Sequence, residues 1–516
     1  MTCAEPLRNL SADAPATPIP VDYDVVISGG RVVDPETGLD AVRTIGIRGR
    51  RIEAVSDTVL RGRVEIDATG RVVAPGFVDL HSHAQTVAGL RLQALDGVTT
   101  ALELEIGAAP VRAAYRAAEL DGRPVNVGFA ASWTTTRARV FDGFSGADPV
   151  PLRAFLSHAG LPNWRERRGC ADVQTVLGEL EKEFTDGALG LGIALGYAPG
   201  TDPAEYTELA RLAADLDMPT FTHARWMSTV SPTSAVEATA EIISAAANTG
   251  AHMHFCHLNS TTHRMADTTG AMLADAIARG ARISTEAYPY GSGCTAVGAP
   301  FLAPKALPQL GITARSIVHV ATGRRMTDNT ELTALRAADP GALVIIDILD
   351  EENSIDRRLL LTSLSGPDTV IASDAMPPMS ASGTFVTDEW PLPESAHSHP
   401  RGAGCYARTF RWLVRESNTL TLSEAVRRCA LLPAQILQRA APAMRRKGRI
   451  QSGADADLAI FDLDTITDRS TYTATTRPST GMDHVLVGGE FVVRDGAVQP
   501  DAMPGQPVYG RFHHSN

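Results

Sequence analysis

The sequence predicts an α/β protein, in which a (β/α)8 barrel (a TIM barrel) accompanies a small β-sandwich domain built from both ends of the chain. Helical and strand patterns alternate through most of the chain, which is typical of a parallel sheet, and at this length the sheet is expected to close into a barrel. Short β-rich runs broken by glycine and Asp-Pro turns come before and after the alternating region, and they predict the sandwich.

The chain of 516 residues offers enough length for a large barrel with additions. Residues 1–22 are rich in proline and alanine and are expected to form a flexible N-terminal lead. Residues 23–73 and 441–516 are assigned to the two parts of the sandwich, and 74–440 to the barrel. The stretch near 300–365 fits the alternation poorly, so we expect an insertion there, which could cover an active site or decorate the surface.

The helix expected at 202–217 illustrates the alternation. Asp202 can cap this helix, Pro203 lies in its first turn, and Glu205 follows three residues after the cap. Apolar side chains recur along it at helical spacing. The residues that follow, 218–225, have the pattern of a strand, and the same order of helix and strand recurs further along the chain.

The composition limits the partners of this protein. With 47 basic and 59 acidic residues the net charge is −12, which argues against a nucleic acid or an anionic membrane as partner. No apolar run approaches the roughly 18 residues of a membrane span, and no signal peptide is recognised. The six cysteines form no CxxC pair, which predicts free thiols and a cytoplasmic protein. A small molecule is therefore the expected partner, and a homo-oligomer is possible.

Lysine is scarce in this chain. Lys182, Lys305 and Lys447 are the only lysines among the 47 basic residues, and all the others are arginines. The simplest interpretation is genomic codon bias. The scarcity still limits the chemistry, because any mechanism that depends on lysine must use one of three residues.

A His-Ser-His motif ends the first strand expected for the barrel. In VVAPGFVDLHSH, His81 and His83 are two residues apart, so they lie on one face of the strand, about 6.5–7 Å apart. Two imidazoles placed in this way can bind one metal ion, at about 2.0–2.1 Å each for zinc. Active sites of such barrels lie at the C-terminal ends of the strands. The motif therefore predicts a metal site.

Three further residues end later strands and complete the expected centre. His223 ends one strand and His257 the next, and Asp374 follows the apolar run expected to be the last strand. An aspartate at this position can bind the metal and accept a proton from the water that the metal activates. His252 and His254 have the opposite parity to His257, so we expect them to pack or to form hydrogen bonds rather than bind metal.

With these residues in this order, the chain resembles the amidohydrolase superfamily. Within it, the chain is similar to the N-acyl-D-amino-acid deacylase (D-aminoacylase) family from residue 23 to the end. The stretches that carry the resemblance are PGFVDLHSH, DGVTT, GALGLGIALGYAPG, THAR, EAYPYGSG, IASD, HPRGAGCYAR and GRIQSGADADLAIFDLDTITDRSTY. The resemblance implies a barrel with a β-sandwich, one or two zinc ions, and hydrolysis of the amide bond of an N-acyl-D-amino acid.

The ligand that bridges two metals in the superfamily must differ here. Many members use a carboxylated lysine, but none of the three lysines ends a barrel strand. The deacylases usually offer a cysteine after GVTT, whereas this chain continues ALELEIG. Glu103 and Glu105 share a face of that strand, and either could supply the bridge. We prefer Glu105 because it is nearer the end of the strand.

Other differences from the deacylase family fall around the expected substrate. Asn259 stands where the family has a lysine, and Ser132 and Trp133 stand where it has a histidine. Arg225 is retained, and it could hold a substrate carboxylate or form a structural ion pair. The residues expected to bind the substrate are Arg225, Asn259, Tyr288, Tyr290 and Cys294.

The working hypothesis is a zinc-dependent hydrolase of a linear amide, with an N-acyl-D-amino acid or a related N-acyl small molecule as substrate. His81 and His83 would hold one ion, His223 and His257 a second, with Glu105 as the bridge and Asp374 as the catalytic base. Opening of a cyclic amide and deamination are alternatives at the same centre. A non-catalytic binding protein is disfavoured, because every expected histidine and the aspartate are present.

Overall fold

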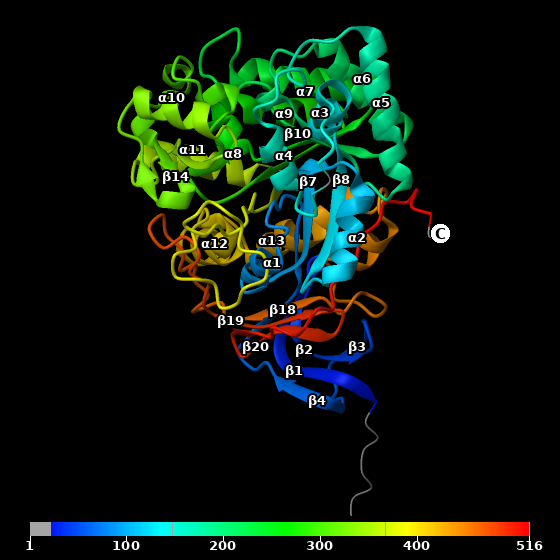
Figure 1. Ribbon diagram of the computed structural model, residues 1–516. Coiled ribbons are helices and arrows are strands. Elements are labelled where there is room, and N and C mark those ends of the chain that lie inside the picture. Colours follow the sequence, from blue (N-terminus) through cyan, green and yellow to red (C-terminus); the bar gives the residue numbers. More distant parts are fainter. Residues whose placement is uncertain (1–21, 147, 367, 515–516) are drawn as a thin grey trace, which may run out of the picture.

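The protein is described by a computed structural model of residues 22–146, 148–366 and 368–514. Nearly all of the lead expected at 1–22 lies outside the described residues. Figure 1 shows two bodies along the long axis of the molecule. The larger one contains a barrel with its helices, and the smaller one is made of strands from both ends of the chain.

The larger body contains an eight-stranded parallel sheet that is rolled into a nearly closed barrel. Its order is β17-β12-β11-β10-β9-β8-β7-β6. The first and last strands meet where the amide of His83 donates to the carbonyl of Ala375 at 2.9 Å. The predicted barrel is therefore confirmed. Its strands are β6 (Phe77–Asp79), β7 (Val98–Ala108), β8 (Asn126–Ser132), β9 (Leu191–Ala194), β10 (Pro219–His223), β11 (His252–Phe255), β12 (Ile283–Ala287) and β17 (Thr369–Ile371).

Helices connect the strands and cover the outside of the barrel (Figure 1). Asp202 caps α6 as predicted, because its side chain accepts a hydrogen bond from the amide of Ala204. Ser234 and Glu237 form a capping box at the start of α7. The longer helices are α1 (Val87–Ala94), α2 (Val111–Asp121), α3 (Trp133–Asp142), α4 (Pro151–His158), α5 (Cys170–Thr185), α6 (Pro203–Asp215), α7 (Ala235–Thr249), α9 (Ala266–Ala278), α11 (Ser354–Ser365) and α12 (Arg401–Arg408).

The smaller body is a nine-stranded, mostly antiparallel sheet that joins the two ends of the chain. Buried side chains such as Ile27, Ile45 and Ile460 form its core. After its last strand the chain returns to the barrel, where the amide of Val508 donates to the carbonyl of Val127 at 2.7 Å. The strands are β1 (Tyr23–Asp34), β2 (Leu39–Arg48), β3 (Arg51–Ser56), β4 (Gly62–Asp67), β5 (Val72–Pro75), β18 (Leu458–Phe461), β19 (Met482–Val487), β20 (Glu490–Arg494) and β21 (Ala497–Val498).

Between β12 and β17 the chain leaves the barrel and forms a separate four-stranded antiparallel sheet, which we call the excursion (residues 288–353). The excursion starts at residue 288, earlier than the insertion that was expected near 300–365. After the excursion, α11 packs against α9 of the barrel. The order of the sheet is β13-β16-β14-β15. Its elements are β13 (Ser292–Ala296), β14 (Ile317–His319), β15 (Arg324–Arg325), α10 (Asn329–Ala338) and β16 (Leu343–Asp347).

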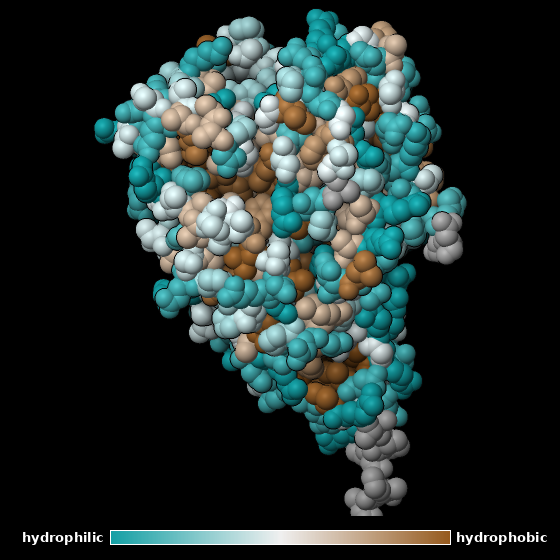
Figure 2. Space-filling view, viewed as in Figure 1, coloured by the Kyte–Doolittle hydropathy of each residue, from teal (hydrophilic) through white to brown (hydrophobic). Residues whose placement is uncertain are grey.

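The surface in Figure 2 is largely hydrophilic, with apolar atoms gathered in a hollow of the larger body. The excursion approaches α4, since Ala342 of the excursion and Leu156 of α4 line one cavity. Within the described part of the chain, we find no helix with the length and hydropathy that a membrane span needs.

Candidate metal centre

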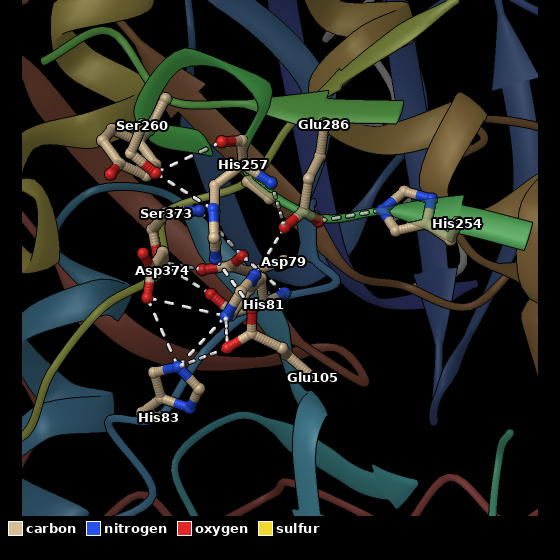
Figure 3. A network of polar contacts seen from close by, with 12 residues as sticks. Asp79, His81, His83, Glu105, His254, His257, Ser260, Glu286, Ser373 and Asp374 are labelled. Carbon is tan, nitrogen blue, oxygen red and sulfur yellow. Dashed lines mark hydrogen bonds and ion pairs between the residues drawn. The ribbon is translucent and has the colours of Figure 1, made fainter. Parts of the chain in front are cut away.

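The six residues predicted to bind metal converge at the C-terminal ends of the barrel strands. Each comes from the C-terminal part of a strand or from the residues that follow it. Figure 3 shows five of them facing one point: His81, His83, Glu105, His257 and Asp374. All are buried, none with more than 5% of its surface exposed. They are His81, His83, Glu105, His223, His257 and Asp374.

His81, His83 and Asp374 form the first group of potential ligands. The Nε2 atoms of the two histidines are 3.0 Å apart. Oδ1 of Asp374 lies 3.5 Å from Nε2 of His81 and 3.3 Å from Nε2 of His83. Three donor atoms this close together, on rigid strand ends, can share one ion.

Glu105, His223 and His257 form the second group. Oε1 of Glu105 lies 2.7 Å from Nε2 of His257, whose ring centroid is 4.9 Å from that of His223. The other oxygen, Oε2, lies 3.4 Å from Nε2 of His81 in the first group. The carboxylate of Glu105 therefore stands between the two groups and faces each with one oxygen.

The backbone is held in an uncommon conformation at two of these residues. His257 has φ 34° and Asp374 has φ 50°, both in the left-handed region that residues other than glycine rarely adopt. Each such residue costs of order 1–3 kcal/mol, and such strain is typical of functional sites. At both positions this conformation turns a side chain at the end of a strand towards the centre of the barrel.

A second layer of residues orients the imidazoles. Nδ1 of His83 donates to Oε2 of Glu103 at 2.7 Å. Nδ1 of His81 donates to Glu286, which also accepts a hydrogen bond from Nε2 of His254 at 3.0 Å. Because these carboxylates hold a proton on each Nδ1, the Nε2 atoms of His81 and His83 face the centre and would offer their lone pairs to a metal ion that replaces the second proton. Glu103, the alternative bridge, thus orients a ligand instead.

The electrostatics of the first group fit a cation. Burial alone would lower the pKa of His83, but the charges of Glu103 and Asp374 outweigh it and raise the pKa to about 9. Burial likewise opposes the charge of His81, yet three carboxylates, with Glu286 foremost, raise its pKa well above the usual range. A positive charge between these nitrogens is therefore favoured, and zinc accepts this set of nitrogen and oxygen ligands.

The second group presents a neutral imidazole and an ionised carboxylate. Burial lowers the pKa of His223 to about 4. Its Nδ1 donates to the carbonyl of Ala224 at 2.8 Å, which turns Nε2 inward. Burial would raise the pKa of Glu105, but His81 and His257 lower it well below the usual range. Metals bind the deprotonated forms of these groups, so this group also fits a metal ion.

Cys256 adds a sulfur next to the centre, which the sequence analysis did not foresee. Its Sγ groups with a nitrogen of His81 and an oxygen of Glu105, all within 4.8 Å of one another. Burial raises the pKa of this thiol well above its usual value, so it is protonated in the absence of a metal.

Arg401 holds Asp374 in place. Its Nη2 lies 2.7 Å from Oδ2 of Asp374, and its Nε donates to the backbone carbonyl of the same residue at 2.7 Å. Burial would raise the pKa of this carboxyl, but Arg401 and His81 outweigh it and lower the pKa. One oxygen of Asp374 is thus paired, and Oδ1 is left facing the histidines.

Comparison with known proteins agrees with this geometry. A sequence model of the amidohydrolase family matches residues 64–296 and 258–493. The chain belongs to the amidohydrolase family. The resemblance predicted from the sequence is thereby confirmed.

Relatives and solved structures extend the match to almost the whole chain. N-acyl-D-glutamate deacylase of Alcaligenes xylosoxydans xylosoxydans is 28% identical, over 93% of this chain and 94% of that protein. A D-aminoacylase structure superposes with a TM-score of 0.73 at 22% identity, covering 94% of this chain and 100% of that one. N-acyl-D-glutamate deacylase from Bordetella bronchiseptica, complexed with zinc and a phosphonate inhibitor, has a TM-score of 0.71 at 24% identity, over 94% and 99% of the two chains.

The cavity of this amidohydrolase lies between the centre and the excursion. Tyr288 and Cys294, two of the residues expected to bind substrate, line it together with five of the six potential metal ligands. The hydroxyl of Tyr288 makes no hydrogen bond within the described residues. Burial raises the pKa of Tyr288 to about 12 and that of the Cys294 thiol likewise to about 12, so both remain protonated at neutral pH.

The structure does not bring the other three expected substrate residues to the cavity. Arg225 pairs with Glu241, with Nη2 at 2.8 Å, and its Nη1 donates to the carbonyl of Thr201 at 2.8 Å. Asn259 donates to the carbonyl of Tyr290 at 3.0 Å, so it fixes the loop after β12. Tyr290 packs under the guanidinium of Arg408. Of the two roles that the sequence left open for Arg225, the structure shows the structural ion pair and not a place at the substrate.

Sequence reasoning missed Glu286 and Arg401. Both lie in stretches that carry the family resemblance, EAYPYGSG and HPRGAGCYAR, but neither stretch shows which residue faces the centre. The parity of His252 and His254 was informative. Both form hydrogen bonds with Oγ of Ser284, at 2.9 and 2.8 Å, and neither belongs to a potential metal group in the described chain.

Proposed function

We propose that this amidohydrolase is a zinc-dependent deacylase, which cleaves the amide bond of an N-acyl-D-amino acid. The observation that carries the proposal is the convergence of four histidines, Glu105 and Asp374 in a chain that aligns over 93% of its length with a deacylase. His81 and His83 would hold one ion and His223 and His257 a second, with Glu105 between them. A bound zinc ion would polarise the amide carbonyl and lower the pKa of the attacking water.

Asp374 is the proposed base. Its free oxygen, Oδ1, lies within 3.5 Å of both histidines of the first group, so it faces the place where water and substrate meet. Arg401 keeps the carboxylate ionised and fixed in orientation. Asp374 would take a proton from the water and return it to the leaving nitrogen.

Tyr288 and Arg401 are the proposed contacts for the polar end of the substrate. Tyr288 lines the cavity and keeps its proton, so its hydroxyl can donate to an oxygen of the substrate. The guanidinium of Arg401 lies 4.5 Å from the centroid of the Tyr288 ring. Its Nη1 is buried without a hydrogen-bond partner among the described residues. This proposal assigns to Arg401 the role that the sequence suggested for Arg225.

A panel of N-acetylated amino acids, assayed with added zinc, tests the function. We expect release of acetate and the free amino acid from D enantiomers, with L enantiomers at least about tenfold slower in kcat/KM. A preference for L enantiomers would overturn the assignment of configuration. Release of ammonia, or opening of a cyclic amide without cleavage of the N-acyl substrates, would favour deamination or cyclic amide hydrolysis instead.

The compartment and the assembly of the protein are part of the same proposal. We place the enzyme in the cytoplasm, because its five described cysteines are free thiols. Light scattering of the purified protein would show whether it forms a homo-oligomer.

A further inference from the structure

The cavity has two unlike sides. One side is the metal centre, with its histidines and carboxylates. The other side is apolar and comes largely from α4 and from the excursion. Its residues are Leu152, Phe155, Phe301, Leu343, Ile346 and Ile348, which we call the apolar wall.

No cation is available on the apolar wall. Within residues 22–146, 148–366 and 368–514, no lysine or arginine lines the cavity. Arg225 is held by Glu241, with both carboxylate oxygens within 3.0 Å of its Nε. Arg401 does not line the cavity, its Nη2 pairs with Asp374, and its Nη1 has no partner among the described residues, so it can serve at most one carboxylate. The acidic side chains that line the cavity, Glu105 and Asp374, both belong to the metal centre.

This distribution of charge limits the anionic groups that a substrate can carry. Arg401 can serve one carboxylate, which an N-acyl-amino acid has as its α-carboxylate. A second carboxylate would face either the apolar wall or the metal centre, where Glu105 and Asp374 already supply the acidic ligands. A buried carboxylate without a partner is strongly disfavoured, and nearby negative charges add to the penalty.

We propose that the substrate of this enzyme carries an apolar side chain and that the apolar wall excludes acidic ones. This inference rests on the proposed deacylase function and names its substrate class. It separates this enzyme from the relative named N-acyl-D-glutamate deacylase, although that protein is 28% identical to it. Ile346 and Ile348 are the proposed specificity residues, since both come from the excursion and have no part in the metal centre.

A second cavity adjoins the apolar wall. The cavity at the metal centre measures about 30 Å³. A second cavity of about 480 Å³ adjoins α4 and the start of β16, and Leu156, Ala342 and Met379 are among its lining residues. Phe155 and Leu343 of the wall are adjacent in the sequence to Leu156 and Ala342.

The test compares N-acetyl-D-leucine, N-acetyl-D-glutamine and N-acetyl-D-glutamate with the zinc-loaded enzyme. We expect kcat/KM for leucine to exceed that for glutamate by at least about 100-fold. Glutamine has the size of glutamate without its charge, and we expect its kcat/KM to exceed that of glutamate at least about tenfold. Equal or better hydrolysis of glutamate would overturn the inference and leave the deacylase function intact. If the enzyme hydrolyses neither these three compounds nor any other N-acyl-D-amino acid, the deacylase function itself is refuted.

Variants of the wall test its role directly. Ile346→Arg supplies the missing cation, and we expect it to reduce the ratio of leucine to glutamate at least about tenfold. Ile346→Leu is the matched control and should keep the ratio of the wild type. Ile348→Arg is a second position in case the first variant does not fold, as judged by circular dichroism and zinc content. An unchanged ratio in a folded, zinc-loaded arginine variant would show that the wall does not set the specificity.

Discussion

Replacing Glu286 by glutamine should weaken the binding of metal without unfolding the protein. Glu286 accepts hydrogen bonds from Nδ1 of His81, from Nε2 of His254 and from the amide of His257 at 3.2 Å. It therefore fixes one ring and one backbone position of the metal centre. Glutamine has the same shape, and its carbonyl can still accept from His81, but its charge is lost.

Loss of such an orienting carboxylate typically costs 10–100-fold in metal affinity, which is about 1.4–2.7 kcal/mol. We would measure the zinc affinity by competition with a chromophoric chelator. Glu183→Gln is the matched control, because Glu183 is buried and accepts from the amide of Val111, away from the centre. A zinc affinity of Glu286→Gln within twofold of the wild type would refute the orienting role.

Three further predictions concern catalysis and stability. Asp374→Asn should lower kcat at least about 100-fold while zinc content and far-UV circular dichroism stay unchanged; near-normal turnover would contradict its role as base. Arg225→Gln breaks a buried ion pair, so it should lower the free energy of unfolding by about 3 kcal/mol and leave KM within twofold. A large rise in KM, with the stability in urea unchanged, would place Arg225 at the substrate instead. Burial lowers the pKa of His158 to about 4 in the folded protein, below the roughly 6.5 of an unfolded chain. The unfolded chain therefore binds a proton below about pH 6.5 that the folded protein binds only near pH 4, so acid favours unfolding in this range. Between pH 7 and 4, the free energy of unfolding of the wild type should fall by about 3 kcal/mol more than that of His158→Gln. Equal losses would contradict this.

The sequence predicted the barrel and the set of potential ligands because both depend on local patterns. His81 and His83 share a face by strand parity, and His223 marks the end of a strand by its position alone. The choice of Glu105 over Glu103 rested on the same argument. In the structure Glu105 faces both groups of potential ligands, whereas Glu103 holds a histidine from behind.

The partners of charged residues could not be predicted in this way. Arg225 and Glu241 are separated by a loop and the start of α7, and no periodic pattern relates them. Arg401 reaches Asp374 from a helix that follows the last barrel strand. Such pairs depend on how whole elements pack. The start of the excursion was also missed, because β13 follows β12 after only a few residues.

The excursion divides the enzyme into parts that can change independently. All six potential metal ligands belong to the barrel or to the residues that end its strands, whereas β13 and β16 supply much of the opposite side of the cavity. Mutations within 288–353 can therefore alter which molecules are accepted while the reactive centre is preserved. For directed evolution, this segment is the place to concentrate a library, and natural relatives can diverge there without losing their chemistry.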